Sequence, residues 1–215
     1  MDTITGITAH PRKPGRFSVE AGRDVLGILS IDAIERLHLS AGMVVDGGTR
    51  AALERESAIL ATYDRALNML AARGRAAAEL RRLLVRKGEP VEYVDAAIER
   101  LHEVGFIDDE RFARQFARSR AMGGGVSRRR VQQELGRRGV ARDLSAEAIA
   151  DVFAEEALDE QASLMQVASK KLRTLEQVDV ATRRRRLYGY LARRGYDGDD
   201  IARALRELID RAATE

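Results

Sequence analysis

One spacing pattern occurs three times in the sequence: two apolar residues four positions apart, followed four positions later by a glycine. The three copies are Leu80, Leu84 and Gly88, then Val131, Leu135 and Gly139, then Leu187, Leu191 and Gly195. Residues four apart lie on one face of an α-helix, and glycine is the residue that most often ends a helix. The pattern therefore predicts three amphipathic helices that end alike, and hence a chain built from repeated helical units.

Apolar residues on either side of this pattern predict two further helices in each repeat. Apolar pairs begin ten residues after each glycine, at Ile98 and Leu101, Ile149 and Val152, and Leu205 and Leu208. Apolar residues also precede each pattern, at Leu60, Leu67 and Leu70, at Phe112 and Phe116, and at Leu164, Leu172 and Leu175. Each repeat should therefore be a three-helix module with a shared apolar face. We expect the core to include Leu80, Leu84, Phe112, Phe116, Val131, Leu135, Ile149, Leu187, Leu191 and Leu205.

The first part of the chain has a different pattern. Runs such as ITGITAHP and GRFSVEAGRDVLGILS are typical of short strands separated by glycines, and SIDAIERLHL has the spacing of a short helix. We therefore predict a mostly α-helical protein with a small β-containing N-terminal extension over 1–48. Three tandem three-helix modules should follow at 49–104, 105–158 and 159–215, forming an elongated, curved rod.

Composition argues against several classes of function. The 215-residue chain has no cysteine, and His10, His38 and His102 are too scattered for a metal cluster, so we expect no metal and no other cofactor. The triple glycine at 123–125 lacks the Lys-Ser/Thr of a phosphate-binding loop, and no pattern typical of a catalytic triad or carboxylate pair is present. The sequence therefore predicts that the protein is not an enzyme.

No segment has the apolar length of a membrane span, about 20 residues, and the first residues lack the apolar centre of a signal peptide. We predict a soluble cytoplasmic protein, and a monomer because neighbouring modules can cover each other's apolar faces.

The acidic run from Asp108 to Glu110 could in principle bind a metal ion, but its place at a predicted helix start favours helix capping.

Charge is distributed unevenly along the chain, although the net charge is only +3. The middle helix of each module is basic: 75–88 and 126–138 each have five basic residues and one acidic residue, and 183–194 has six basic residues and none acidic. Each third helix is acidic in balance, over 89–104, 139–157 and 195–215. The basic helices could pair with acidic ones, could form a binding surface, or could simply be solvated.

A helical projection at about 100° per residue sorts these arginines by direction. With Val131 and Leu135 toward the core, three arginines of the second module point away from it, and three in the third module occupy the equivalent positions. The first module has only two arginines near this surface. The predicted basic stripe consists of Arg82, Arg86, Arg129, Arg130, Arg137, Arg185, Arg186 and Arg193. Such a stripe suits a phosphate backbone or the acidic groove of a protein polymer.

Two segments of the second module carry a family resemblance. GFIDDERFARQF, followed by a glycine-containing turn and then RRRVQQELGRRGV, resembles the central signature of the RecX family of recombinase regulators. The resemblance extends more weakly over about 57–213, where the family also has three tandem three-helix modules, and LHLSAGMVVD is similar to the N-terminal extension of many members. GRAAAELRRLLVRKG matches the family's usual start of the first basic helix only in part.

The resemblance implies a non-enzymatic regulator of the RecA recombinase. Members of the family are understood to bind the RecA–DNA filament along its groove and to suppress filament growth, ATP hydrolysis and strand exchange. The implied partners are therefore the RecA filament and, weakly and without specificity, single- or double-stranded DNA. End-capping, groove blocking and subunit loss all stay open as modes of inhibition. The alternative is a stand-alone helical DNA-binding protein that uses the basic middle helices, where only Gln132 and Gln133 are suited to reading bases.

Overall fold

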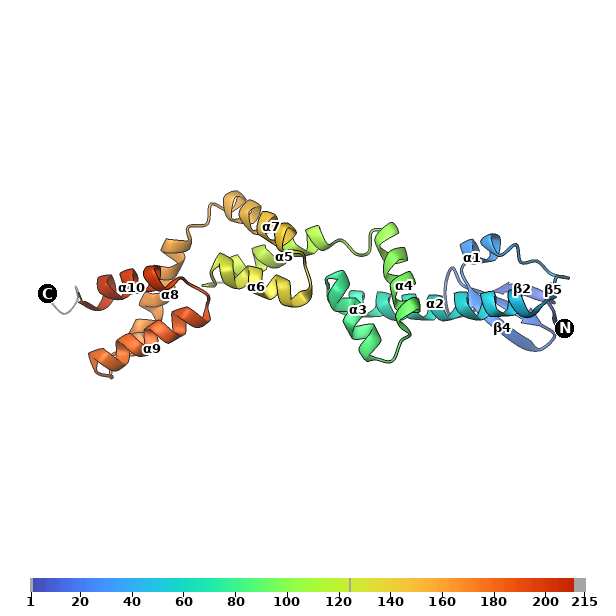
Figure 1. Cartoon of the computed structure of the whole chain (residues 1–215), viewed down its shortest axis with the longest axis horizontal. Helices are drawn as coiled ribbons and strands as arrows, with labels where there is room; N and C mark the ends of the chain where they lie inside the picture. Colours follow the sequence, from blue (N-terminus) through green and yellow to red (C-terminus); the bar gives the residue numbers. More distant parts are fainter. Residues whose placement is uncertain (1, 124, 211–215) are drawn as a thin grey trace. The chain divides into compact units, whose positions relative to one another are not determined.

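The computed structural model describes residues 2–123 and 125–210, without the side chain of Asp210. The chain divides into two compact units, Met1–Ile107 and Asp108–Glu215. From Gly47 onward the described residues are mainly helical. Every strand in the described part of the chain lies before residue 46 (Figure 1). The prediction of a mostly α-helical protein with a small β-containing N-terminal extension is therefore confirmed.

The N-terminal extension contains two small antiparallel sheets. One pairs β1 (Asp2–Thr3) with β5 (Val44–Val45), and the other joins, in this order, β2 (Gly6–Ala9), β3 (Phe17–Ala21) and β4 (Asp24–Leu29). The short helix predicted from SIDAIERLHL is present as α1 (Ile31–Arg36). The core of the extension includes Ile4, Val19 and Leu29, and also Leu53 from the long helix that follows. The extension is thus packed against that helix.

The first module consists of α2 (Gly47–Ala72), α3 (Ala77–Arg86) and α4 (Val91–Glu103). The first helix, α2, contributes side chains to two hydrophobic cores. Leu53 lies in the core of the extension, and Ala66 lies in the core of the module. Leu80 and Leu84 are fully buried, as their spacing predicts. Gly88 follows α3 with a φ of +92°, a left-handed conformation that glycine adopts without steric cost.

The second module consists of α5 (Asp109–Met122), α6 (Arg128–Arg138) and α7 (Arg142–Glu155). Val131 and Leu135 are fully buried on one face of α6. The helix begins at Ser127, whose Oγ accepts a hydrogen bond from the backbone N–H of Arg130 at 3.1 Å. It ends at Gly139, which has a left-handed φ of +91°. Both the apolar face and the glycine end that the pattern predicts are present.

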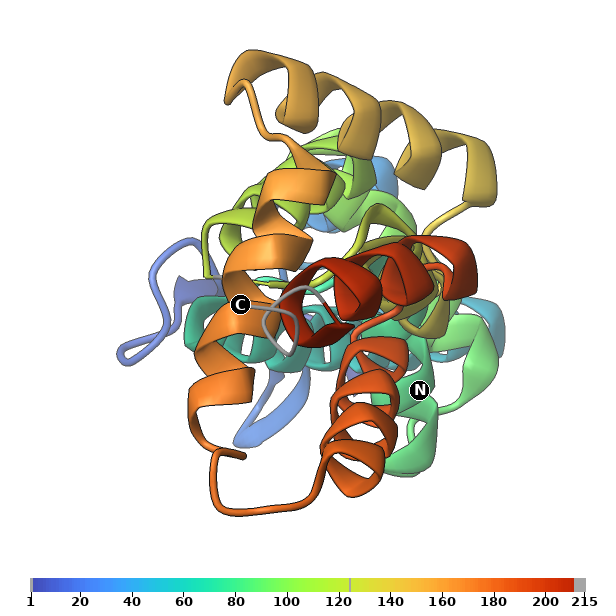
Figure 2. The ribbon, with the colours of Figure 1, turned by 90° about the vertical axis from the view of Figure 1, so that its left-hand side faces the viewer.

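The third module consists of α8 (Glu160–Arg173), α9 (Val180–Arg193) and α10 (Gly198–Leu205), continued by a π-helical turn over Arg206–Asp210. These three helices lie nearest the viewer in Figure 2. Leu187, Leu191 and Leu205 are buried in its core. Gly195 follows α9 with a φ of +90°, so the third copy of the pattern ends as the other two do.

The prediction that Phe112 and Phe116 are buried is wrong. Both are only half-buried, and their rings stack on each other with centroids 6.1 Å apart. The fully buried residues of α5 are Ala113 and Ala117, each one position further along. Small side chains at a helix contact let the two helix axes approach closely, whereas two phenylalanines would hold them apart. The other eight predicted core residues are buried.

Candidate partner-binding surface

The basic stripe is most complete on α9. Leu187 and Leu191 face the core, and Arg185, Arg186 and Arg193 are exposed. Within residues 2–123 and 125–210, none of these three guanidinium groups has an ion-pair partner. Their charges are therefore available for charge-assisted hydrogen bonds to carboxylates or phosphates.

A carboxylate cap sets where α9 begins. Oδ1 of Asp179 accepts a hydrogen bond from the backbone N–H of Thr182 at 2.9 Å. This hydrogen bond holds the pKa of Asp179 below its ordinary value, so the cap is charged at neutral pH. A fixed start fixes the register, and the register determines which arginines of α9 face outward.

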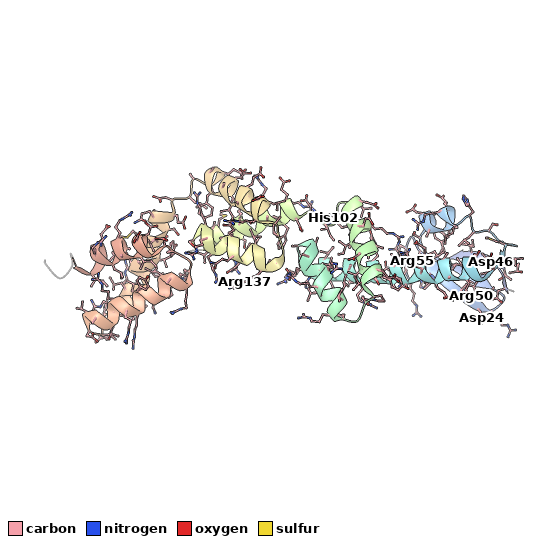
Figure 3. All side chains as sticks on the ribbon, viewed as in Figure 1. Asp24, Asp46, Arg50, Arg55, His102 and Arg137 are labelled. Carbon is pink, nitrogen blue, oxygen red and sulfur yellow. The ribbon has the colours of Figure 1, made fainter. Side chains whose placement is uncertain are left out.

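On α6 the three arginines of the stripe differ from one another. Arg129 and Arg137 are exposed, and Arg137 extends from the outside of the helix (Figure 3). Arg130 is only partly exposed, because its Nε lies 3.0 Å from Oε1 of Glu134 on the next turn. Glu134 also pairs with Arg120 of α5 at 2.8 Å. Arg130 therefore differs from the outward-pointing cation that the helical projection predicts.

Arg130 also lies where the second module meets the third. A Cβ added to Gly195 would be 2.7 Å from Cβ of Arg130 and 2.6 Å from Oγ of Ser127, so a side chain does not fit there. The backbone N–H of Ser127 donates to the carbonyl of Arg194 at 3.1 Å. The guanidinium of Arg194 in turn donates to the carbonyl of Gly125 at 2.9 Å. The end of α9 thus packs directly on the start of α6.

The first module contributes least to the stripe. Arg82 and Arg86 are exposed on α3. Their neighbour Arg81 is paired with Asp95 of α4, with 2.6 Å between Nε and Oδ1. This hydrogen bond also holds the pKa of Asp95 below its ordinary value. The charge of Arg81 is therefore balanced within the module rather than offered to a partner.

Three acidic residues at the C-terminal end of α7 pair with arginines of α5. Arg114 contacts Asp151 at 2.6 Å and also contacts Glu155. Arg118 lies 2.8 Å from Glu155 and 2.7 Å from Glu156. The net charges of the middle and third helices do not predict these pairs, because the arginines that form them lie on the first helix of the module. Arginines of the first helix of the module therefore balance these carboxylates of its third helix.

The acidic run at the start of α5 caps the helix, as predicted. Oδ1 of Asp108 accepts a hydrogen bond from the backbone N–H of Arg111 at 2.8 Å. Across 2–123 and 125–210, no three His, Asp or Glu side chains gather so as to hold a metal ion, and His102 stands exposed on α4 (Figure 3). The helices of this described part include none with the length and apolar character needed to cross a membrane.

Three family models match the chain in the order of its modules. The first three-helix domain of RecX matches residues 63–101, the second matches 108–149 and the third matches 159–205. A crystal structure of a regulatory protein RecX superposes with a TM-score of 0.78 over 98% of this chain and 100% of that chain, at 18% identity. RecX from Lactobacillus salivarius gives a TM-score of 0.56 over 70% of this chain and 96% of its own, also at 18% identity. These two structures share the fold of the chain.

Sequence relatives agree with the family models. Regulatory protein RecX from Mycolicibacterium vanbaalenii is 38% identical over 134 residues, which cover 61% of this chain and 73% of that protein. Regulatory protein RecX from Pelodictyon phaeoclathratiforme is 33% identical over 144 residues, which cover 67% of this chain and 86% of that protein. With its three modules matched in order and its fold shared, the chain belongs to the RecX family.

Proposed function

We propose that this protein binds RecA–DNA filaments and suppresses their growth, ATP hydrolysis and strand exchange, and that it thereby modulates homologous recombination and DNA repair. The observation that carries the proposal is that three exposed arginines on α9, Arg185, Arg186 and Arg193, lack ion-pair partners in the described part of a RecX-family chain. Exposed charges contribute little to stability, so the fold alone gives no reason to place Arg185, Arg186 and Arg193 there.

The proposed contact is electrostatic and distributed. Each guanidinium can form paired, charge-assisted hydrogen bonds with a carboxylate or a phosphate, and a RecA–DNA filament carries both along a repeating surface. Arg129 in the second module, and Arg185, Arg186 and Arg193 in the third, would each add a weak contact. Contacts on one chain reinforce one another, because the second forms at the high effective concentration that the first creates. Binding should therefore weaken steeply with added salt.

In this proposal the protein is not an enzyme. It acts in the cytoplasm as a monomer, by occupying the filament, and it needs neither a catalytic group nor a cofactor. The surface that supports this role is made of charged side chains held by short capped helices. Such a surface provides binding energy and position, which are what a regulator of a polymer requires.

The test is the RecA ATPase on single-stranded DNA, measured with increasing amounts of this protein. We expect inhibition well below one molecule per RecA, because one bound regulator affects a filament of many subunits. A stand-alone DNA-binding protein, the alternative function, would inhibit only when it covers the DNA, and excess DNA would restore activity. Unchanged ATPase at one molecule per RecA would contradict the proposal.

A further inference from the structure

A groove of about 260 Å³ lies between α6 and α7 of the second module. Arg129 of α6 and Arg142 at the start of α7 both line it. Gly136 and Val140 add small and apolar surface, and the rest of the lining is polar, from Gln132, Gln133 and Ser145. Among the described residues, no carboxylate lines the groove.

The glycine in this groove is not explained by the fold. Gly136 lies inside α6, where glycine is less favourable than alanine, and a Cβ added to it would meet no heavy atom within 4 Å. The equivalent residue is Val85 in the first module and Ala192 in the third. Space and helix propensity would therefore both permit a larger residue. The effect of glycine is to leave the groove open and to let a partner approach the helix backbone.

Charge restricts what this groove can bind. Neither Arg129 nor Arg142 has an ion-pair partner among residues 2–123 and 125–210. Arginine binds a carboxylate through two parallel hydrogen bonds, and glutamine amides donate to carbonyl oxygens. Two such arginines beside a small apolar surface therefore suit an acidic side chain that has an apolar neighbour.

Single-stranded nucleic acid fits this groove less well. Proteins that bind it without sequence preference stack the bases on aromatic rings, and none of the described residues that line this groove is aromatic. In the third module, Tyr188 stands at the position of Gln132, with its hydroxyl 3.5 Å from where a Cβ on Gly198 would lie. The tyrosine covers a place that is open in the second module. The volume is also below the roughly 300–1,000 Å³ of small-molecule pockets, which suits one or two side chains.

We propose that the groove receives an acidic side chain of a partner protein. Its carboxylate would lie between Arg129 and Arg142, and the neighbouring apolar residue would rest on Gly136 and Val140. The inference deepens the proposed function and rests on it for the identity of the partner, which is the protein surface of the RecA filament. It assigns this face of α6 to protein recognition rather than to DNA.

The groove is testable on the full chain without RecA. In nitrogen–proton NMR spectra, the backbone amide of Gly136 reports directly on the groove. We expect millimolar acetyl-Gly-Leu-Asp-Gly-amide to shift the signals of Gly136, Gln132 and Gln133, and the same peptide with Asn in place of Asp to leave them unchanged. If oligothymidylate shifts Gly136 and the acidic peptide does not, the site is for nucleic acid and the proposal is overturned. Unchanged spectra with both ligands would also overturn it.

A filled groove provides the second test. Gly136→Leu places a side chain in the groove at a position where leucine favours the helix, so its melting temperature should be at least that of the wild type. We expect it to lose the peptide-induced shift of Gln133 and to bind RecA filaments about tenfold more weakly. Ala192→Leu makes the equivalent change on the exposed side of α9 and should leave peptide binding unchanged. Equal peptide binding by both variants would count against the groove.

The two measurements separate this inference from the proposed function. If the wild type inhibits RecA while the acidic peptide leaves Gly136 unshifted, the groove assignment is wrong and the regulatory function stands. If the peptide binds at Gly136 while the RecA ATPase is unaffected, the regulatory function is wrong and the acidic side-chain site stands.

Discussion

The helices α6 and α9 hold the same place in successive modules and have the same two buried positions, yet their arginines have different surroundings. On α9, Arg186 is exposed and has no ion-pair partner in the described part of the chain. On α6, the equivalent Arg130 is half-buried and paired with Glu134 at 3.0 Å. Equivalent positions in a repeat therefore do not guarantee equivalent roles.

The residue one turn further along each helix accounts for the difference. The position of Glu134 is occupied in α9 by Tyr190, which offers no negative charge. The hydroxyl of Tyr190 accepts a hydrogen bond from Arg194 at 2.8 Å, and the guanidinium of Arg194 lies 4.6 Å from the ring centre. Arg186 is thus left without a carboxylate at the spacing that stabilises a helical pair. One residue therefore decides whether the arginine at this position is paired within its helix, as Arg130 is, or is exposed without an ion-pair partner in the described part of the chain, as Arg186 is.

The largest effect should come from the buried residues that the two helices share. Leu135→Ala and Leu191→Ala each remove a fully buried leucine, so each should lower the free energy of unfolding by about 2–5 kcal/mol. Because the two positions are equivalent, we expect similar losses in chemical denaturation. Wild-type stability in either variant would show that the two cores are not built alike.

Apolar spacing was sufficient to predict this shared core, because a helix face is fixed by positions three and four apart. It was not sufficient for α5, where 112, 113, 116 and 117 are all apolar and two neighbouring faces fit the same spacing. The choice of Ala113 and Ala117 depends on how closely α5 approaches its neighbour, which only the tertiary structure determines.

The candidate surface was predicted in part for a similar reason. The helical projection assigned Arg185, Arg186 and Arg193 to the outside of α9, where the structure has them. It could not anticipate that Arg130 contacts Gly195, since that contact joins two modules. Nor does a single-helix projection identify the groove at Gly136, which needs α7 as its second wall. The residues of a surface formed by one helix can be predicted from the sequence, whereas a surface formed by two helices depends on how those helices pack.

The next largest effect should come from the contact between the modules. Gly88→Ala and Gly195→Ala both place alanine at a φ near +90°, which costs about 1–2 kcal/mol in a left-handed conformation. At Gly88 the new Cβ meets nothing within 4 Å, whereas at Gly195 it would clash with Ser127 and Arg130. Gly195→Ala should therefore cost about 1–3 kcal/mol more, as overpacked sites do. Equal melting temperatures for the two variants would mean that the modules do not meet at Gly195.

A smaller effect, on binding, should follow from removing the arginines. Changing Arg185, Arg186 and Arg193 together to alanine should leave the melting temperature nearly unchanged and weaken binding to RecA filaments about tenfold at low salt, where screening is least. The equivalent second-module variant, with alanine at 129, 130 and 137, should also weaken binding. It should in addition melt lower, because it removes the pair between Arg130 and Glu134.

Filament affinity for these two variants is best measured by fluorescence anisotropy across a salt series. If both bind as the wild type does at every salt concentration, the basic stripe is only a solvated surface. If the second-module variant melts at the wild-type temperature, the ion pair of Arg130 contributes nothing to stability, and the proposed difference between α6 and α9 fails.

The smallest effect concerns the caps, because α6 begins at a neutral serine and α9 at a carboxylate. The pKa of Asp179 is lowered by its hydrogen bond to the backbone N–H of Thr182, so this cap stabilises the folded state above the pKa of the unfolded chain. The stabilisation is lost as the pH falls through the lower folded pKa.

Asp179→Ala should therefore lower stability at neutral pH, and its difference from the wild type should shrink in acid. Ser127→Ala removes a cap that does not titrate, so its difference should stay constant over the same range. Thermal melts of the three proteins from neutral to acid pH would decide this, and parallel curves would show that the carboxylate of Asp179 adds no pH dependence to α9.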